Sequence, residues 1–228
     1  MIFFRENSDL LNEITLLQPE IEHLKSFRIF HKDKEVEFRD GSGNSFFYYV
    51  QESSEKGILR NKKIFQEKEY AIEIATAIPK SERLDFLIQK GTEIGVSRFL
   101  FVNFMQSERK DFNLDRSQKI IKEAASQSKR HFLPKIQKYE KLEKLLDSGK
   151  KFFYLDPLSE ENISEEKIKN RVPIIGPEGG FRKEEIELLS KRGVSGYCIG
   201  KNILKIETAF LYIASVIQYI SFFSEKDT

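Results

Sequence analysis

The chain has 228 residues, 39% of them hydrophobic, which is enough for one large or two modest domains with a real core. Its 38 basic and 36 acidic residues leave a formal net charge of only +2, so any RNA-binding surface must come from local clustering of cations. The single cysteine, Cys198, excludes an intrachain disulfide, and scattered histidines at 23, 31 and 131 argue against a metal site.

The first residues, Met1 to Glu6, lack the long apolar core of a signal peptide. No stretch reaches the roughly 18 apolar residues that are needed to span a bilayer. A lone cysteine in an apolar segment also fits a reducing compartment. We therefore expect a cytoplasmic protein with no membrane partner.

Residues 1 to about 70 have the pattern of short strands. Residues 35–38 alternate, residues 40–44 have turn chemistry, and residues 46–50 resume a strand, which together predict a hairpin. Residues 62–65 and 70–75 predict further strands, so a barrel or sandwich is favoured. The basic residues scattered here, among them Arg5 and Arg28, are by themselves most often a solvated surface.

From Ala77 the pattern changes to alternating helix and strand, which is typical of a layered α/β domain. Ser81 is a suitable cap for a helix, and Arg83 and Lys90 lie nearly above one another at the edge of its apolar face. With Lys80, these cations would either contact a phosphate backbone or pair with neighbouring acids, and the residues alone leave both interpretations open. The apolar face consists of Leu84, Leu87, Ile88, Gly91 and Ile94.

Further elements follow in the same alternation. Residues 98–102 predict a strand that leads into a polar loop at 106–110, and residues 117–130 predict a helix that ends in Lys129 and Arg130. Cations at a helix C-terminus are often only partners of the helix dipole. Residues 152–155 predict another strand, and the alternating charges that follow, up to Arg171, indicate a solvated helix or loop without chemistry of its own.

The stretch at 172–181 predicts a buried strand that ends abruptly in a glycine loop, followed by a helix from Glu184. Glycines free the loop from Cβ atoms, so its backbone can approach a ligand closely. Residues 196–200 repeat this design, and a long apolar helix follows from Phe210 to Ile220. The two loops suggest one shared site at the end of a sheet. The spacing fits equally well with glycines that only terminate strands, because neither loop has a P-loop or dinucleotide pattern.

The motifs Ile-Gly-Pro-Glu-Gly-Gly-Phe at 175–181 and Ile-Gly-Lys-Asn-Ile-Leu-Lys-Ile-Glu-Thr-Ala at 199–209 resemble those of the bacterial 16S ribosomal RNA (uracil-N3) methyltransferases, a family of the SPOUT superfamily. The resemblance covers most of the chain in order. The upstream positions that carry it are Lys80, Arg83, Lys90, Glu93, Gly95, Ser107, Glu108, Arg109, Gln127, Arg130 and Pro134.

The resemblance implies an α/β fold: a small PUA-like β-barrel at residues 1–72 that helps to hold RNA, followed at 73–228 by a SPOUT domain with a C-terminal trefoil knot. It also implies S-adenosylmethionine as cofactor, 16S ribosomal RNA or the small ribosomal subunit as substrate, and a homodimer. The apolar face of the last helix is an expected part of the dimer interface, the alternative being a core helix in a monomer.

The implied site residues fall into three groups. The expected cofactor-binding residues are Ile175, Gly176, Pro177, Glu178, Gly179, Gly180, Ile199, Gly200, Ile203, Leu204, Thr208 and Ala209. The expected substrate-binding residues are Arg5, Arg28, Lys80, Arg83, Lys90 and Arg109. The expected catalytic residues are Lys205 and Arg130, with Arg83, for charge stabilisation and base positioning, and Glu178 and Glu207 for proton handling or loop geometry.

Three positions depart from the family pattern. Ser126 replaces a glutamate, Lys205 replaces an arginine, and Ile206 replaces a threonine. Lysine keeps the charge but not the planar fork of arginine, and isoleucine removes a possible hydrogen bond. Two other functions stay open: a non-catalytic RNA-binding protein on the same fold, and a SPOUT methyltransferase that acts on transfer RNA or on a ribose 2′-hydroxyl.

Overall fold

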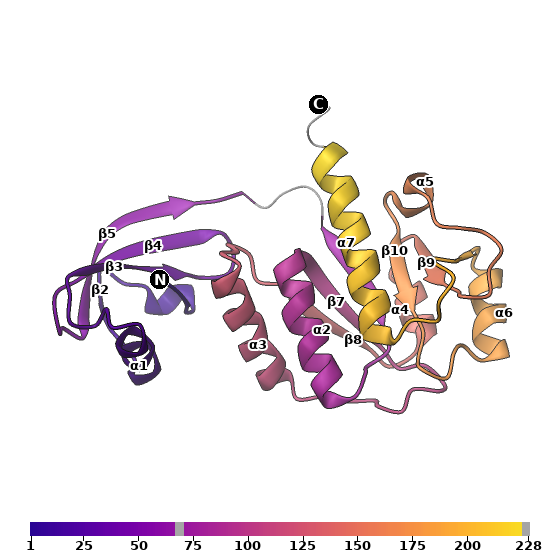
Figure 1. Ribbon diagram of the computed structural model, residues 1–228, viewed down its shortest axis with the longest axis horizontal. Coiled ribbons are helices and arrows are strands. Elements are labelled where there is room, and N and C mark those ends of the chain that lie inside the picture. The colour runs from indigo at the N-terminus through magenta and orange to yellow at the C-terminus, as the bar shows by residue number, and fades with distance from the viewer. Residues whose placement is uncertain (67–70, 225–228) are drawn as a thin grey trace. The chain divides into compact units, whose positions relative to one another are not determined.

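The computed structural model describes residues 1–66 and 71–224, so the start of the predicted strand at 70–75 lies outside the described residues. The chain divides into two compact units (Figure 1). The first consists of Met1–Glu69 and Lys122–Leu133, and the second of Tyr70–Ile121 and Pro134–Thr228. The sequence-based boundary between residues 72 and 73 stays a proposal, and residues 122–133 join the first unit although they follow the start of the second.

The first unit contains a five-stranded sheet with the order β1-β3-β4-β5-β2. The predicted hairpin is confirmed, because β3 and β4 pair antiparallel with Val36 opposite Tyr48. At the turn between them the Asp40 carboxylate accepts hydrogen bonds from Ser42 and Asn44. Its elements are β1 (Ile2–Phe4), η1 (Asn7–Asp9), β2 (Glu13–Thr15), α1 (Gln18–Ser26), β3 (Lys34–Arg39), β4 (Asn44–Val50) and β5 (Lys56–Ile64).

The core of this unit forms where helix α1 and the inward residues of β3 and β4 meet. Leu24, Val36, Phe38, Tyr48 and Val50 are fully buried there. Alternation along β3 and β4 places every second side chain on this face, as the hydrophobic pattern predicted. The Tyr48 hydroxyl is satisfied by donating to the carbonyl of Leu11, so the one polar atom of this side chain does not weaken the core.

Residues 122–133 belong to the first unit through specific contacts with its strands. The Ser126 hydroxyl donates to the carbonyl of Ile2 at 2.6 Å. The Arg39 guanidinium donates to the carbonyls of Lys129 and Arg130 at 2.6 and 2.7 Å. The ring of His131 stacks on Phe65 with 3.5 Å between centroids. These partners are far apart in sequence, so no local pattern could have indicated the grouping.

The second unit is an α/β unit, as predicted, with a six-stranded sheet in the order β11-β9-β10-β6-β7-β8. All neighbouring strands pair in parallel. Their carboxyl ends therefore share one edge of the sheet, which is where ligands bind in open α/β folds. The strands are β6 (Ile72–Thr76), β7 (Val96–Val102), β8 (Lys135–Tyr139), β9 (Phe152–Leu155), β10 (Val172–Ile175) and β11 (Gly196–Tyr197).

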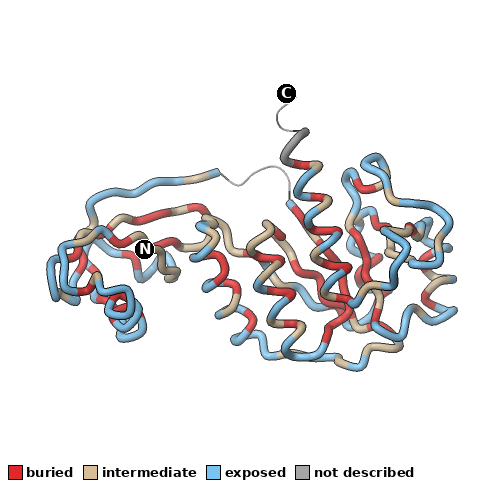
Figure 2. Tube along the Cα trace, viewed as in Figure 1, coloured by how far each residue is buried: buried red, intermediate tan, exposed pale blue. Residues whose placement is uncertain are grey.

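Two long helices, α2 and α7, lie side by side in this unit and contact the central strands (Figure 1). Gly91 of α2 allows this approach, because a Cβ at this position would lie 2.8 Å from Phe99 and 2.9 Å from Phe210. Figure 2 shows the buried strands beneath them. The helices of this unit are α2 (Ser81–Ile94), α4 (Leu142–Leu146), α5 (Glu165–Ile168), α6 (Lys183–Lys191) and α7 (Ile206–Ser224), and α3 (Leu114–Gln127) begins in this unit and ends in the first.

Two local expectations differ from the structure. Lys80, rather than Ser81, is the N-cap of α2, and it makes no side-chain cap hydrogen bond. The strand expected at 196–200 is only two residues long, Gly196–Tyr197, so residues 198–200 already form part of a loop. Among the helices within the described residues, none is long and apolar enough to cross a bilayer.

Candidate active site

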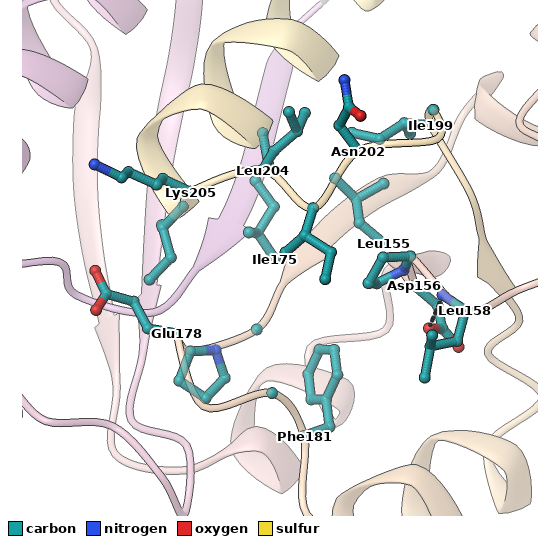
Figure 3. A pocket seen from close by; sticks show the side chains of 18 of the residues that line it. Leu155, Asp156, Leu158, Ile175, Glu178, Phe181, Ile199, Asn202, Leu204 and Lys205 are labelled. Atoms are coloured by element: carbon teal, nitrogen blue, oxygen red, sulfur yellow. Dashed lines mark hydrogen bonds between the residues drawn. The ribbon is translucent and has the colours of Figure 1, made fainter.

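A pocket of about 660 Å³ lies beyond the carboxyl ends of β9, β10 and β11 (Figure 3). Three consecutive strands of the sheet each contribute the loop that leaves them, and α6 and α7 complete the wall. The volume is in the range of small-molecule and cofactor sites. The residues that line the pocket are Arg83, Leu155, Asp156, Pro157, Leu158, Ile175, Gly176, Pro177, Glu178, Gly180, Phe181, Ile186, Ile199, Gly200, Asn202, Ile203, Leu204, Lys205, Ile206 and Ala209.

The glycine loop after β10 keeps part of the pocket open. Gly180 has φ +75°, a conformation that favours glycine, and a Cβ there would meet no heavy atom of the described chain within 4 Å. At Gly176 a Cβ would lie 2.9 Å from the ring of Phe181. That ring is held edge-on by Phe104 and Tyr154, with 5.4 Å between centroids in each case. Gly176 therefore lets an aromatic ring form one wall of the pocket.

A buried carboxylate fixes the same loop to the end of β7. Glu185, 5% exposed, accepts one hydrogen bond from the backbone N–H of Arg182 at 2.8 Å and another from that of Met105 at 2.9 Å. The Arg182 interaction is one half of a capping box at the start of α6. Next to it, the Gln106 side-chain amide donates to the carbonyl of Gly179 and accepts from the Arg182 guanidinium. The loop is thus held from outside the pocket.

At the rim, Arg83 of α2 joins the two glycine-containing loops. Its guanidinium contacts the Glu178 carboxylate, and its Nε lies 3.6 Å from Oε1 of Glu207 at the start of α7. The second oxygen of Glu207 is buried and makes no hydrogen bond to the described residues. Lys205 is exposed and points out on the same side of the pocket as Glu178 (Figure 3). Two carboxylates and two cations therefore lie at one side of the pocket, whose remaining lining is mostly apolar apart from Asp156 and Asn202.

A small crevice adjoins the pocket and shares Pro177, Glu178 and Ile206 with it. The strand ends of β6 and β7 supply its other residues, including Lys80 and Arg109. The Lys80 ammonium lies 3.2 Å from the Glu108 carboxylate, and both side chains are largely exposed. An exposed pair of this kind is worth little, so Lys80 can exchange Glu108 for another anion.

Most of the predicted cofactor-binding residues come together at the pocket. Ten of the residues expected there line it, whereas Gly179 contacts Gln106 and Thr208 is exposed outside the lining. Whether these residues bind a cofactor stays a prediction. The ten are Ile175, Gly176, Pro177, Glu178, Gly180, Ile199, Gly200, Ile203, Leu204 and Ala209.

The predicted substrate-binding and catalytic residues are more dispersed. Arg5 forms an ion pair with Glu20 in which each side chain is only 9% exposed, so this geometry gives it a structural role and no support as an RNA contact. Lys90 pairs with Glu93 at 2.9 Å on the same helix. Arg28, exposed after α1, and Arg130 both belong to the first unit. The roles of all these predicted substrate-binding and catalytic residues stay predictions.

Sequence reasoning missed the segment Leu155–Leu158, to which it assigned no chemistry, although this segment lines the pocket. Its backbone is fixed because Asp156 donates its N–H to Tyr197 and accepts from Leu158. The sequence does contain a signal for this loop, because Asp-Pro directly follows a short apolar strand. The carboxyl ends of parallel strands share one edge of the sheet, so the loop after this strand is expected near the other two loops. Phe181 and Asn202, which also line the pocket, lay inside the motifs but had received no role.

The apolar walls and few polar groups suit an organic molecule with flat rings and polar edges. Among the described residues, no group of three or more histidine, cysteine, aspartate or glutamate side chains is arranged to hold a metal ion. The site combines a largely apolar pocket, a backbone freed by glycine, and a charged rim at the adjoining crevice.

A family model described as an RNA methyltransferase domain matches residues 66–218. The ribosomal RNA small subunit methyltransferase E of Mesomycoplasma hyopneumoniae is 32% identical over 92% of this chain and 93% of its own length. That of Bacillus subtilis is 31% identical over 64% of each chain. Among solved structures, the enzyme of the same name from Neisseria gonorrhoeae, bound to S-adenosyl methionine, has a TM-score of 0.79 at 23% identity over 96% of this chain and 97% of that one.

Proposed function

We propose that this chain, which belongs to the ribosomal RNA small subunit methyltransferase E family, transfers the methyl group of S-adenosylmethionine to N3 of a uridine in 16S ribosomal RNA. The relatives named above carry this enzyme's name, and one similar structure holds the cofactor. The observation that carries the proposal is the pocket formed by the two family motifs at the carboxyl ends of β10 and β11.

The pocket fits the cofactor by size and chemistry. Its apolar side chains, among them Leu155, Ile175 and Leu204, would enclose the adenine ring. At Gly180 and Gly200 a Cβ would meet no heavy atom of the described chain within 4 Å. This open space would let backbone groups reach the ribose and the amino-acid end of the cofactor. When bound, the cofactor supplies an electrophilic methyl group on a sulfonium.

We place the target base over the mouth of the adjoining crevice, whose own volume of about 20 Å³ is too small to enclose a uracil ring. Glu178 lines both the pocket and the crevice, so its carboxylate lies at the boundary where base and methyl donor would meet. Lys80 and Arg109 line the crevice and are the cations available to the nucleotide's phosphate. The base would thus approach from the side of β6 and β7, and the cofactor from the side of β9 and β11.

Methylation at N3 requires the uracil to lose a proton that is weakly acidic in water. We assign proton acceptance to Glu178, and stabilisation of the negative charge that develops on the uracil oxygens to Lys205. Arg83 is a positioning residue that holds Glu178 and Glu207 in a fixed arrangement. Bound RNA and cofactor would cover this exposed rim and exclude water from it, which would strengthen each of these charge interactions.

Finer features of the fold belong to the same proposal. The curled sheet of the first unit is the proposed PUA-like barrel, and the loops after β10 and β11 with helix α7 are the proposed trefoil knot. A homodimer and a cytoplasmic location are also proposed. Phe210, Ile213 and Ala214 are buried within the chain, so a dimer would use other residues of α7, such as the half-exposed Tyr212.

The test is methyl transfer from labelled cofactor to small ribosomal subunits and to naked 16S ribosomal RNA that both lack the modification. After digestion to nucleosides, mass spectrometry identifies the product. We expect N3-methyluridine. A methylated ribose, or transfer only to transfer RNA, would support the other methyltransferase activities, and RNA binding without cofactor binding would support a non-catalytic RNA-binding protein.

A further inference from the structure

A second cavity, of about 490 Å³, lies at the opposite ends of the three strands that form the cofactor pocket. Residues just before β9, β10 and β11 line it, whereas the pocket is lined by residues that follow these strands. Helix α4 contributes Leu146, and the turn after α6 contributes Gly193. A Cβ atom added at Gly193 would have no heavy atom of the described chain within 4 Å. The cavity is separate from the site described above.

Four cations line this cavity: Lys150, Lys151, Arg171 and Arg192. Lys150 pairs with the nearly buried Glu73 at 2.6 Å, and Arg192 pairs with Asp147 at 2.8 Å. Lys151 and Arg171 have exposed side chains, and within residues 1–66 and 71–224 neither forms an ion pair. No carboxylate side chain is part of the lining itself.

This arrangement favours a bound anion. Like charges that face one cavity repel one another, and two of the four have no counter-charge in the described part of the chain. Arg192 and Asp147 are each about half exposed, so their pair contributes little and Arg192 can turn toward a ligand. A bound phosphate would accept hydrogen bonds from guanidinium and ammonium groups together and offset the repulsion.

We propose that this cavity binds the sugar–phosphate backbone of the RNA substrate at a distance from the methylated base. This inference rests on the proposed function, because it places a second contact of the same RNA on the same unit. Strands β9 and β10, which separate the two sites, have 4 residues each, roughly 13 Å at the rise of a β-strand. β11 is the edge strand, so a folded RNA can pass around this edge from the pocket to the cavity.

RNA fits better here than an acidic protein segment. The basic side chains come from three separate chain segments and surround an open, mostly polar cavity, and few apolar groups are available to hold a peptide. Contacts of this kind neutralise phosphates without reading sequence, and they position the RNA. They also release counterions, so their contribution falls steeply with salt concentration.

The experiment compares the variant Lys151→Gln/Arg171→Gln with the control variant Lys119→Gln/Lys135→Gln. The control removes the same charge from exposed residues of the same unit away from the cavity. Binding of 16S ribosomal RNA is measured across a salt series, together with cofactor binding, methyl transfer and thermal unfolding of each variant. We expect the cavity variant to bind RNA about tenfold more weakly, with a salt slope lower by roughly two, and with unchanged cofactor affinity.

The outcomes separate this inference from the proposed function. Wild-type methyl transfer with equal RNA affinity in the cavity and control variants would overturn the inference alone, and would point to an acidic protein as the partner of the cavity. Weaker RNA binding by the cavity variant, with no methyl transfer by the wild type, would support the RNA surface and overturn the methyltransferase. A wild-type protein that binds no RNA would overturn both.

Discussion

Arg83 and Glu178 form an ion pair at the rim of the pocket beyond β9, β10 and β11, although 95 residues separate them in the chain. Arg83 projects from α2, and Glu178 lies in the glycine loop after β10. The same guanidinium reaches Glu207 at the start of α7. One side chain thus connects the glycine loop after β10 with the first turn of α7, and a substitution of Arg83 should affect the chemistry more than the fold.

We expect Arg83→Lys to lower kcat by roughly 10- to 100-fold, because lysine lacks the planar fork and a small misplacement of catalytic groups is costly. Since Arg83 and Glu178 are each about a third exposed, the free energy of unfolding should change by less than about 1 kcal/mol. The control is Arg116→Lys, which weakens another exposed pair with α2, that to Asp85. Equal loss of kcat in both variants would contradict the proposed role.

The close approach of Phe181 to Gly176 should make the shape of the pocket sensitive to a side chain at position 176. In Gly176→Ala the new methyl group would lie 2.9 Å from the Phe181 ring, which Phe104 and Tyr154 hold in place, so the ring must tilt. We expect a loss of about 1–3 kcal/mol in the free energy of unfolding and roughly tenfold weaker cofactor binding. Calorimetry and urea unfolding measure both. The double variant Gly176→Ala/Phe181→Leu should recover part of each loss, and no recovery would show that Phe181 is not the affected side chain.

The buried carboxylate of Glu185 predicts a stability effect outside the pocket. Glu185→Ala removes the acceptor of two backbone N–H groups, those of Arg182 and Met105. Donors left without partners should cost about 2–3 kcal/mol in the free energy of unfolding. Urea unfolding checks this, with Glu187→Ala on the same helix as the control. A change below about 0.5 kcal/mol would mean that water replaces the carboxylate.

The first unit should lose stability in mild acid through His131. Burial lowers the pKa of this imidazole below its ordinary value, the nearby charge of Arg39 lowers it further, and Glu37 opposes both. The unfolded chain therefore takes up the proton at higher pH than the folded one. The free energy of unfolding contributed here is present above about pH 6.5 and is lost as the pH falls toward the folded-state pKa.

The measurement for this pH effect is the urea midpoint of the wild type and of His131→Phe at roughly pH 7.5 and 5.5. Phenylalanine keeps an aromatic ring beside Phe65 but does not titrate in this range. We expect the variant to lose less stability between the two pH values than the wild type. An equal loss would assign the effect to other groups, such as Glu37 and Asp40, whose pKa values are also lowered.

The sequence predicts the structure correctly where hydrophobic periodicity and turn-forming residues determine it. The β3–β4 hairpin follows from alternation around a turn in which Asp40 binds the backbone of Ser42 and Asn44. The strand, glycine loop and helix at 172–191 likewise follow from apolar β-branched residues, glycines and an acidic first turn. In both places the order of strand, turn and helix is determined by residues a few positions apart, whereas distant contacts such as that of Met105 with Glu185 fix the position of the loop.

What sequence reasoning missed depends on contacts between distant segments. Arg5, which the family resemblance assigns to RNA binding, pairs instead with Glu20 of α1, and no short stretch of sequence indicates this contact. The loop after β9 lines the pocket because the sheet order places β9 between β10 and β11, which no short stretch reveals. The attachment of residues 122–133 to the first unit depends on Arg39 in the same way.

The most direct test of the central claim is titration calorimetry with S-adenosylmethionine on the wild type, Gly180→Arg and Gly149→Arg. Both glycines have nearly the same positive φ, +75° and +76°, and open surroundings within the described chain, but only Gly180 lines the pocket. The account predicts that the wild type and Gly149→Arg bind the cofactor and that Gly180→Arg does not. Cofactor binding that survives in Gly180→Arg, or a folded wild-type protein that binds no cofactor, would contradict it.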